Sequence, residues 1–170
     1  MDTIKRVDGN RSRSMRLGLI LSAVLTLLIF LVSEATAQNG IIRILGGNLT
    51  MNITTGAAGS QPVADVDVTR TLQYWRKAAI AKVTVRTSCP TQAFTLKVLA
   101  TGVVQGVAAP EVTLTDGMLA VDFITSIPSA GTWTSSTITL QYTASATFAQ
   151  GNSAELGNDV HAVTYTLQVQ

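Results

Sequence analysis

The chain has 170 residues, of which 13% are charged, and its formal net charge is +2 at pH 7. The first 37 residues supply this basic balance, because residues 38–170 contain seven Lys and Arg side chains and seven Asp and Glu side chains. A neutral domain lacks the positive field that drives tight nucleic-acid binding, so we exclude nucleic acid as a partner. The length of residues 38–170 suits one domain with a cooperative core.

The N-terminal segment has the three-part order of a secretory signal peptide. Basic residues precede an apolar run at residues 17–32, and the small residues Ala35, Thr36 and Ala37 follow. Small side chains one and three residues before the cut are typical of a cleavage site, so we predict cleavage after Ala37. The chain then divides into an N-terminal signal helix, residues 1–37, and a mature domain, residues 38–170. The basic residues of the signal are Lys5, Arg6, Arg11, Arg13 and Arg16.

A permanent transmembrane anchor is the alternative for this segment. Its apolar run has 16 residues, whereas a helix that spans the hydrocarbon core needs about 20. We therefore expect contact with the membrane only through the signal peptide during export. The predicted location is secreted, periplasmic or cell-surface. Met1 and Met15 both stay open as the true start of the chain.

Cys89 is the only cysteine of the chain. An exported protein with one cysteine has no internal disulfide. Two interpretations remain for this residue. Its side chain packs as a small apolar group, as free cysteines commonly do, or its thiol forms a disulfide between two copies of the chain or is otherwise reactive.

The mature domain has the period-two alternation of half-buried β-strands, with Thr and Val frequent in the strands. In residues 82–87, for example, Val83 and Val85 share one face while Lys82, Thr84 and Arg86 share the other, solvent-facing side. We predict an all-β fold, a single antiparallel β-sandwich of the immunoglobulin-like or pilin-like kind with about eight strands. Further alternating runs lie at residues 94–98, 138–148 and 163–169, and breaks lie at residues 46–47, 56–62, 128–131 and 150–158.

Two segments carry more specific expectations. Asp116 and Gly117 lie between two alternating runs, and this dipeptide tolerates the positive φ angles of a tight hairpin, so we predict one there. Residues 71–82 interrupt the strand pattern. They suit either a short helix or a loop, because Leu72, Trp75 and Ala79 recur at spacings of three and four.

The sequence offers little for catalysis or metal binding. His161 is the only histidine, and no nucleophile motif accompanies it or the nearby Asp159. One histidine and one cysteine are too few for a zinc site of the usual nitrogen and sulfur ligands. Asp65 and Asp67 lie on one strand face, where we expect a solvated surface rather than a calcium site. We therefore predict no enzyme activity, no metal and no cofactor; a hydrolase, the least favoured class, would depend on His161.

A cationic segment is the most unusual local feature of the mature domain. It holds five of the seven mature positive charges and no acidic residue. We predict an interaction patch that docks an anionic surface polymer or the acidic face of another subunit, with aromatic anchors. The alternative is a solvated basic face with Trp75 packed inward. The residues of the predicted patch are Arg70, Tyr74, Trp75, Arg76, Lys77, Lys82 and Arg86.

The sequence combines a predicted signal peptide, a β domain rich in Thr, Val, Ala and Gly with few aromatic residues, and the C-terminal residues 157–167, in which a Gly-Asn-Asp turn precedes a Val-Thr-rich strand. In these features it resembles small bacterial surface proteins of the spore-coat-U and fimbrial-subunit type. Members commonly carry a disulfide, which one cysteine cannot make. The resemblance implies an exported structural or adhesive protein of the cell envelope. Its expected partners are other protein subunits, further copies of the same chain or polymers of the envelope surface. Residues 41–54, apolar and poor in charge, are the candidate for an edge or exchanged strand. The alternative is a secreted or periplasmic module that binds carbohydrate or protein.

Overall fold

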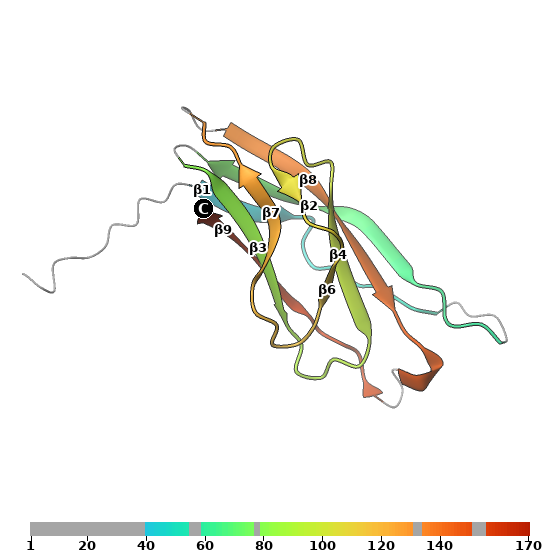
Figure 1. The fold of residues 1–170 in the computed structure, drawn as a ribbon. Coiled ribbons are helices and arrows are strands. Elements are labelled where there is room, and N and C mark those ends of the chain that lie inside the picture. The colour runs from blue at the N-terminus through green and yellow to red at the C-terminus, as the bar shows by residue number, and fades with distance from the viewer. Residues whose placement is uncertain (1–39, 55–58, 77–78, 131–133, 151–155) are drawn as a thin grey trace, which may run out of the picture. The chain divides into compact units, whose positions relative to one another are not determined.

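The computed structural model describes residues 40–54, 59–76, 79–130, 134–150 and 156–170. The predicted signal peptide lies outside this part of the chain. The described residues are all-β, with nine strands where about eight were expected, and one short 3-10 helix (Figure 1). The strands are β1 Gly40–Leu45, β2 Asp65–Arg76, β3 Ala81–Ser88, β4 Thr95–Thr101, β5 Val107–Ala108, β6 Val112–Leu114, β7 Val121–Ile127, β8 Thr134–Ser145 and β9 Ala162–Val169; the helix is η1 Phe148–Gln150.

The strands form two antiparallel sheets. One has five strands in the order β1-β2-β8-β4-β6, and the other has four in the order β5-β7-β3-β9. β1 pairs with its neighbour in sequence, β2, but from β2 onward each strand is followed by a strand of the other sheet. Pairing within each sheet is therefore mostly between segments far apart in the chain, and the two sheets depend on a shared core.

That core lies between the inward faces of the two sheets. Leu72 and Leu140 of the five-stranded sheet and Val83 and Phe123 of the four-stranded sheet are all fully buried in one hydrophobic cluster. The alternation predicted for residues 82–87 is confirmed at Val83 and Val85, which are buried, and at Arg86, which is exposed. It is wrong at Thr84, which is 4% exposed instead of lying on the solvent face. Period-two patterning thus identified the strand faces that contact the core.

A pair of tyrosines joins the two sheets inside this core. The hydroxyl groups of Tyr142 in β8 and Tyr165 in β9 lie 2.9 Å apart, in hydrogen-bond contact. The Tyr165 ring also contacts Phe123, with ring centroids 5.4 Å apart. Burial raises the pKa of both tyrosines above the ordinary value of 10.0. Both hydroxyls therefore stay protonated at neutral pH, and one of them donates its hydrogen bond to the other.

Residues 71–76 are neither a helix nor a loop, because β2 extends through Arg76. Residues 77–78 lie outside the described part of the chain, and residues 79–80 are the non-strand residues before β3. Leu72, Tyr74 and Arg76 are buried at a spacing of two, as a strand requires. β1 and β8 flank β2 on both sides and supply its backbone partners. Pairing across the sheet overrides the local spacing that suggested a helix.

The turn at Asp116 and Gly117 exists, but it does not close a hairpin. Met118 N donates to Thr115 O over 3.1 Å, and Gly117 has a φ of 66°. The flanking strands β6 and β7 belong to different sheets. The prediction of a tight hairpin is therefore wrong, because the turn carries the chain from one sheet to the other.

The long strand expected at residues 138–148 begins and ends earlier. β8 covers Thr134–Ser145, and η1 occupies Phe148–Gln150. Gln150 stabilises the turn after β8, because its side-chain Oε1 accepts a hydrogen bond of 2.7 Å from Thr147 N. Thr147 and Phe148 therefore leave the strand pattern although their alternation continues it.

Arg76 is the one charged side chain among the buried residues of the described chain, and it is only 2% exposed. Its Nη2 donates to Gln105 Oε1. Its Nε and Nη1 have no hydrogen-bond partner within the described residues. A buried donor without a partner costs about 1–3 kcal/mol. Arg76 therefore opposes the stability of the fold rather than supporting it.

We expect Arg76→Met to raise the free energy of unfolding by about 1 kcal/mol or more, because methionine fills similar space without buried donors. Urea unfolding followed by tryptophan fluorescence measures this change. Leu140→Ala in the same core serves as the control and should cost about 2–5 kcal/mol. A loss of stability in Arg76→Met comparable to that of the control would contradict this account of Arg76.

Candidate functional site

Cys89, Asp159 and His161 gather where β3 ends and β9 begins. β3 and β9 pair antiparallel, with Ser88 opposite Ala162. Cys89 follows the last residue of β3, and His161 precedes the first residue of β9. The register of this one pairing therefore brings Cys89 beside His161, although the two are remote in sequence.

One ligand atom from each of these three side chains lies within 4.8 Å of the other two. They are the thiol sulfur of Cys89, a nitrogen of His161 and a carboxylate oxygen of Asp159. Cys89 is fully buried, whereas Asp159 and His161 are partly buried. We call this group the Cys-His-Asp cluster. The sequence, with one histidine and one cysteine far apart in the chain, did not predict this cluster.

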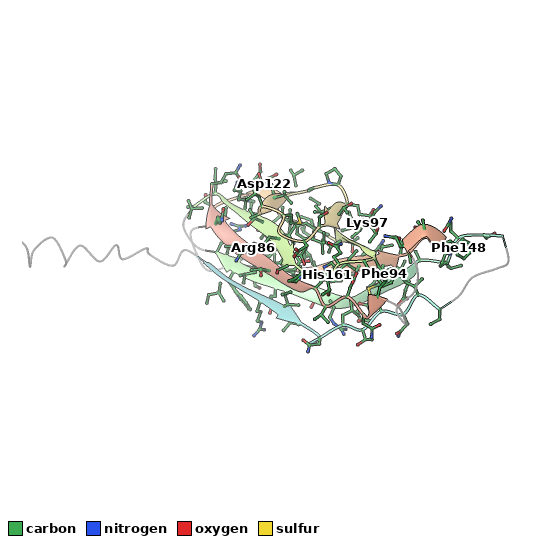
Figure 2. All side chains as sticks on the ribbon, turned by 90° about the horizontal axis from the view of Figure 1, so that it is seen from below. Arg86, Phe94, Lys97, Asp122, Phe148 and His161 are labelled. Atoms are coloured by element: carbon green, nitrogen blue, oxygen red, sulfur yellow. The ribbon has the colours of Figure 1, made fainter. Side chains whose placement is uncertain are left out.

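Two carboxylates hold the loop that follows Cys89. Asp159 accepts bonds from the backbone N–H of Ala93, at 2.9 and 3.1 Å from its two oxygens, and of Phe94, at 2.8 Å. Phe94 and His161 are labelled in Figure 2. Asp116 Oδ1 accepts the backbone N–H of Cys89 at 2.6 Å. Both ends of residues 89–94 are thereby fixed, and Asp159 is anchored in turn.

His161 is oriented by Thr87 of β3. Its Nδ1 lies 3.2 Å from Thr87 Oγ1. Burial lowers the pKa of His161 below its ordinary value of 6.5, and this effect exceeds the opposing attraction of Asp159 and Asp116. At neutral pH the imidazole is therefore uncharged and has one nitrogen with a free lone pair.

The cluster suits ligation better than nucleophilic catalysis. A catalytic thiol must meet its substrate, but the Cys89 side chain has no exposed surface. An intermolecular disulfide would need a thiol that a second copy of the chain can reach. The buried side chain of Cys89 does not meet this requirement. An open hollow of about 480 Å³ adjoins Cys89, and Gln92, Phe94, Thr113 and Asp116 contribute to its lining.

The residues of the predicted cationic patch do not share one surface. Tyr74 and Arg76 are buried in the core. Trp75 lies on the opposite face of β2, where Arg43 stacks over its ring at 4.7 Å from the centroid. The alternation of a strand separates Trp75 from its two neighbours.

The remaining cations of that segment point elsewhere. Lys82 pairs with Asp122 over 2.7 Å on the four-stranded sheet, and Arg86 is exposed on the same strand, β3. Arg70 donates from Nε to Gly47 O over 3.1 Å. Lys77 lies outside the described residues. The change of sheet between β2 and β3 divides charges that are continuous in sequence.

A second feature is the flank where β1 and β9 form the edges of their sheets. Gly40 lies against Leu167, so close that a Cβ on Gly40 would overlap the leucine side chain. Apolar side chains remain exposed along this flank: Ile41, Ile44, Leu45 and Val169 are 38–55% exposed. We call this surface the β1–β9 flank.

Comparisons with family models, with curated proteins and with solved structures found no match to this chain. Among the residues that the structure describes, none belongs to a helix of the length and apolar character needed to cross a membrane. The function is therefore inferred from the fold, the Cys-His-Asp cluster and the β1–β9 flank.

We expect stability to fall as the pH drops through 6.5, because the unfolded chain then binds a proton at His161 that the folded chain binds less readily. His161→Gln, which does not titrate, should lose less stability over the same interval. Thermal unfolding of both proteins between neutral pH and pH 5.5 or so measures the difference. Parallel pH profiles for the two proteins would contradict the lowered pKa of His161.

Proposed function

We propose that this chain is an exported structural or adhesive component of the cell envelope, without catalytic activity, which assembles through the β1–β9 flank. The open edge of β9 is the observation that carries the proposal. Among the described strands, β9 pairs with β3 on one side and with none on the other. An unpaired strand edge is a template for a strand of another molecule.

The order of the strands supports an immunoglobulin-like or pilin-like β-sandwich. Such sandwiches place a four-stranded sheet over a sheet whose last strand in sequence lies at the edge. Here β1, β2, β8 and β4 lie side by side, and β3 pairs with the final strand β9. The described strands offer none beyond β9, so the position next to it can accept an added strand.

The edge of β9 lacks the usual protection against strand addition. Proteins commonly protect long edges with lysine, proline or a bulge. β9 has eight residues, AVTYTLQV, with no charge and no proline, and its pairing with β3 runs without a register shift. This strand is therefore suited to pairing with another chain.

The segment after β1 leaves further backbone groups available on the same flank. In residues 48–54, Leu49, Met51 and Ile53 are half-buried and alternate with exposed polar residues. Leu49 and Met51 pack against the core. Within the described part of the chain, these residues make no backbone–backbone hydrogen bond. Two of their backbone groups already have side-chain partners, since Asn52 N donates to Asp65 Oδ2 and Asn48 O accepts from Arg70 Nη2. Among the described strands, none pairs with this segment.

A second copy of this chain is the partner that fits the flank best. Gln170 N bonds to Ile80 O over 2.8 Å, so β9 ends where β3 begins. β1 begins at that same end, because Gly40 contacts Leu167. β1 and β9 therefore run in opposite directions. A two-fold axis along the strands would pair β1 of each copy antiparallel with β9 of the other, which closes both edges at once.

We expect the native domain to self-associate and the double variant Ala162→Lys with Thr166→Lys to weaken this association at least about tenfold, or 1.4 kcal/mol. Both residues are exposed on β9 and oppose uncharged residues of β3. The added lysines would repel Arg43 on β1 of the second copy. Sedimentation equilibrium over a range of concentrations measures the dissociation constant.

The matched control is Ser135→Lys with Thr137→Lys, which adds the same charge to exposed positions of β8, a strand inside its sheet. This control should associate like the native domain. A strictly monomeric native domain, or equal association of both double variants, would refute assembly through β9. Deletion of residues 39–54 is less informative, because Leu49 and Met51 pack on the core of the same chain.

Export is testable separately from assembly. In a bacterial host, we expect the chain to be recovered outside the cytoplasm with a mass that begins at Gln38. Ala35→Leu with Ala37→Leu should retain the N-terminal segment, whereas Ala35→Ser with Ala37→Ser should still be cleaved, because serine is small. Intact-mass spectrometry distinguishes the products. Recovery of the native sequence uncleaved in the cytoplasm would contradict the proposed location.

A secreted or periplasmic binding module is the second candidate function. The hollow of about 480 Å³ beside Cys89 favours it, because its lining combines Phe94 with polar groups such as Gln92 and Thr113. Such a module would bind carbohydrate or protein saturably as a monomer. A finding that the domain self-associates through β9 would favour the structural component over the binding module.

A further inference from the structure

We propose that the Cys-His-Asp cluster binds one divalent transition-metal ion of the zinc class, through Cys89 Sγ, a nitrogen of His161 and an oxygen of Asp159. This site goes beyond the proposed structural function and is independent of the β1–β9 flank. It also revises the expectation that one histidine and one cysteine make a metal site unavailable, because the carboxylate completes the set.

The donor set favours zinc over calcium or magnesium. Thiolate, imidazole and carboxylate are each established zinc ligands, whereas calcium and magnesium select oxygen ligands alone. Three protein ligands leave a fourth tetrahedral position for water or an external ligand. The thiolate additionally selects metals that accept soft ligands.

The geometry is close to that of a zinc site. Bonds of about 2.3 Å to sulfur and about 2.0 Å to nitrogen and oxygen place tetrahedral ligands roughly 3.5 Å apart. The three ligand atoms already lie within 4.8 Å of one another. A pair of ligand atoms at that limit would have to approach by about 1.3 Å to complete the coordination.

Each ligand has a neighbour that orients it, as metal ligands commonly do. Thr87 Oγ1 contacts Nδ1 of His161 at 3.2 Å; when Nδ1 carries the proton, the Nε2 lone pair is free to bind metal. The N–H groups of Ala93 and Phe94 hold the Asp159 carboxylate. Asp159 Oδ1 accepts only one of these bonds, so it keeps lone-pair capacity for an ion.

The protonation states also suit a metal. The imidazole of His161 offers a nitrogen lone pair when the other ring nitrogen carries the proton. Binding replaces the thiol proton of Cys89 with the metal and releases that proton to solvent, while no other bond changes. Asp116 lies near the cluster, with Oδ1 on the Cys89 N–H, and adds negative charge that attracts a cation.

Cobalt(II) provides a direct probe of the site, since it replaces zinc and gives a thiolate-to-metal charge-transfer band. We expect one equivalent of Co²⁺ to produce that band in the native full chain and Zn²⁺ to displace it. Cys89→Ser should abolish the band. Zn²⁺ should also raise the melting temperature of the native protein but not of Cys89→Ser, because the ion binds the folded state.

His161→Gln keeps the thiol and covers the case in which Cys89→Ser fails to fold. It should bind Co²⁺ at least about tenfold more weakly than the native protein. Glu111→Gln is the control, because it removes a carboxylate that pairs with Lys97 away from the cluster. Absence of the band in folded native protein, or equal Co²⁺ affinity in His161→Gln and Glu111→Gln, would overturn the site.

Discussion

The antiparallel pairing of β3 with β9 is the constraint on which the rest of this structure depends. It joins residues 81–88 to residues 162–169 in an uninterrupted register. One consequence is the open edge of β9, because β3 occupies only one of its sides. The other is the Cys-His-Asp cluster, because the same register carries Cys89 past the end of β3 to the residues that precede β9. The open edge of β9 and the Cys-His-Asp cluster thus both follow from one long-range pairing.

The core must hold the sheets together without covalent help. Cys89 is buried and unbridged, and from β2 onward each strand is followed by one of the other sheet. Hydrophobic contacts and the Tyr142–Tyr165 hydrogen bond therefore connect the two sheets. A fold of this kind closes long loops before its contacts form, so we expect it to fold slowly for its size.

The cationic segment of the sequence does not form a single charged surface in the structure. A run of cations along the chain becomes separate groups when a strand alternates its faces and the next strand joins the other sheet. Lys82 has an acidic partner in Asp122, whereas Arg76 is buried with two nitrogens unpaired within the described chain. Arg43 and Trp75, which stack on the outside of the five-stranded sheet, belong to neighbouring strands rather than to one segment.

The sequence by itself determined the all-β class and the inward faces of strands such as β3, because residues two apart on a strand share a face whatever the strand pairs with. The neutral charge of residues 38–170 also follows from the composition alone, and the proposed signal peptide depends likewise on composition and local order. Only the tertiary structure decided that residues 71–76 continue β2, that the Asp116–Gly117 turn changes sheets, and that Cys89 meets Asp159 and His161. These features depend on which distant strands pair and in what register, and local patterns contain no information about either.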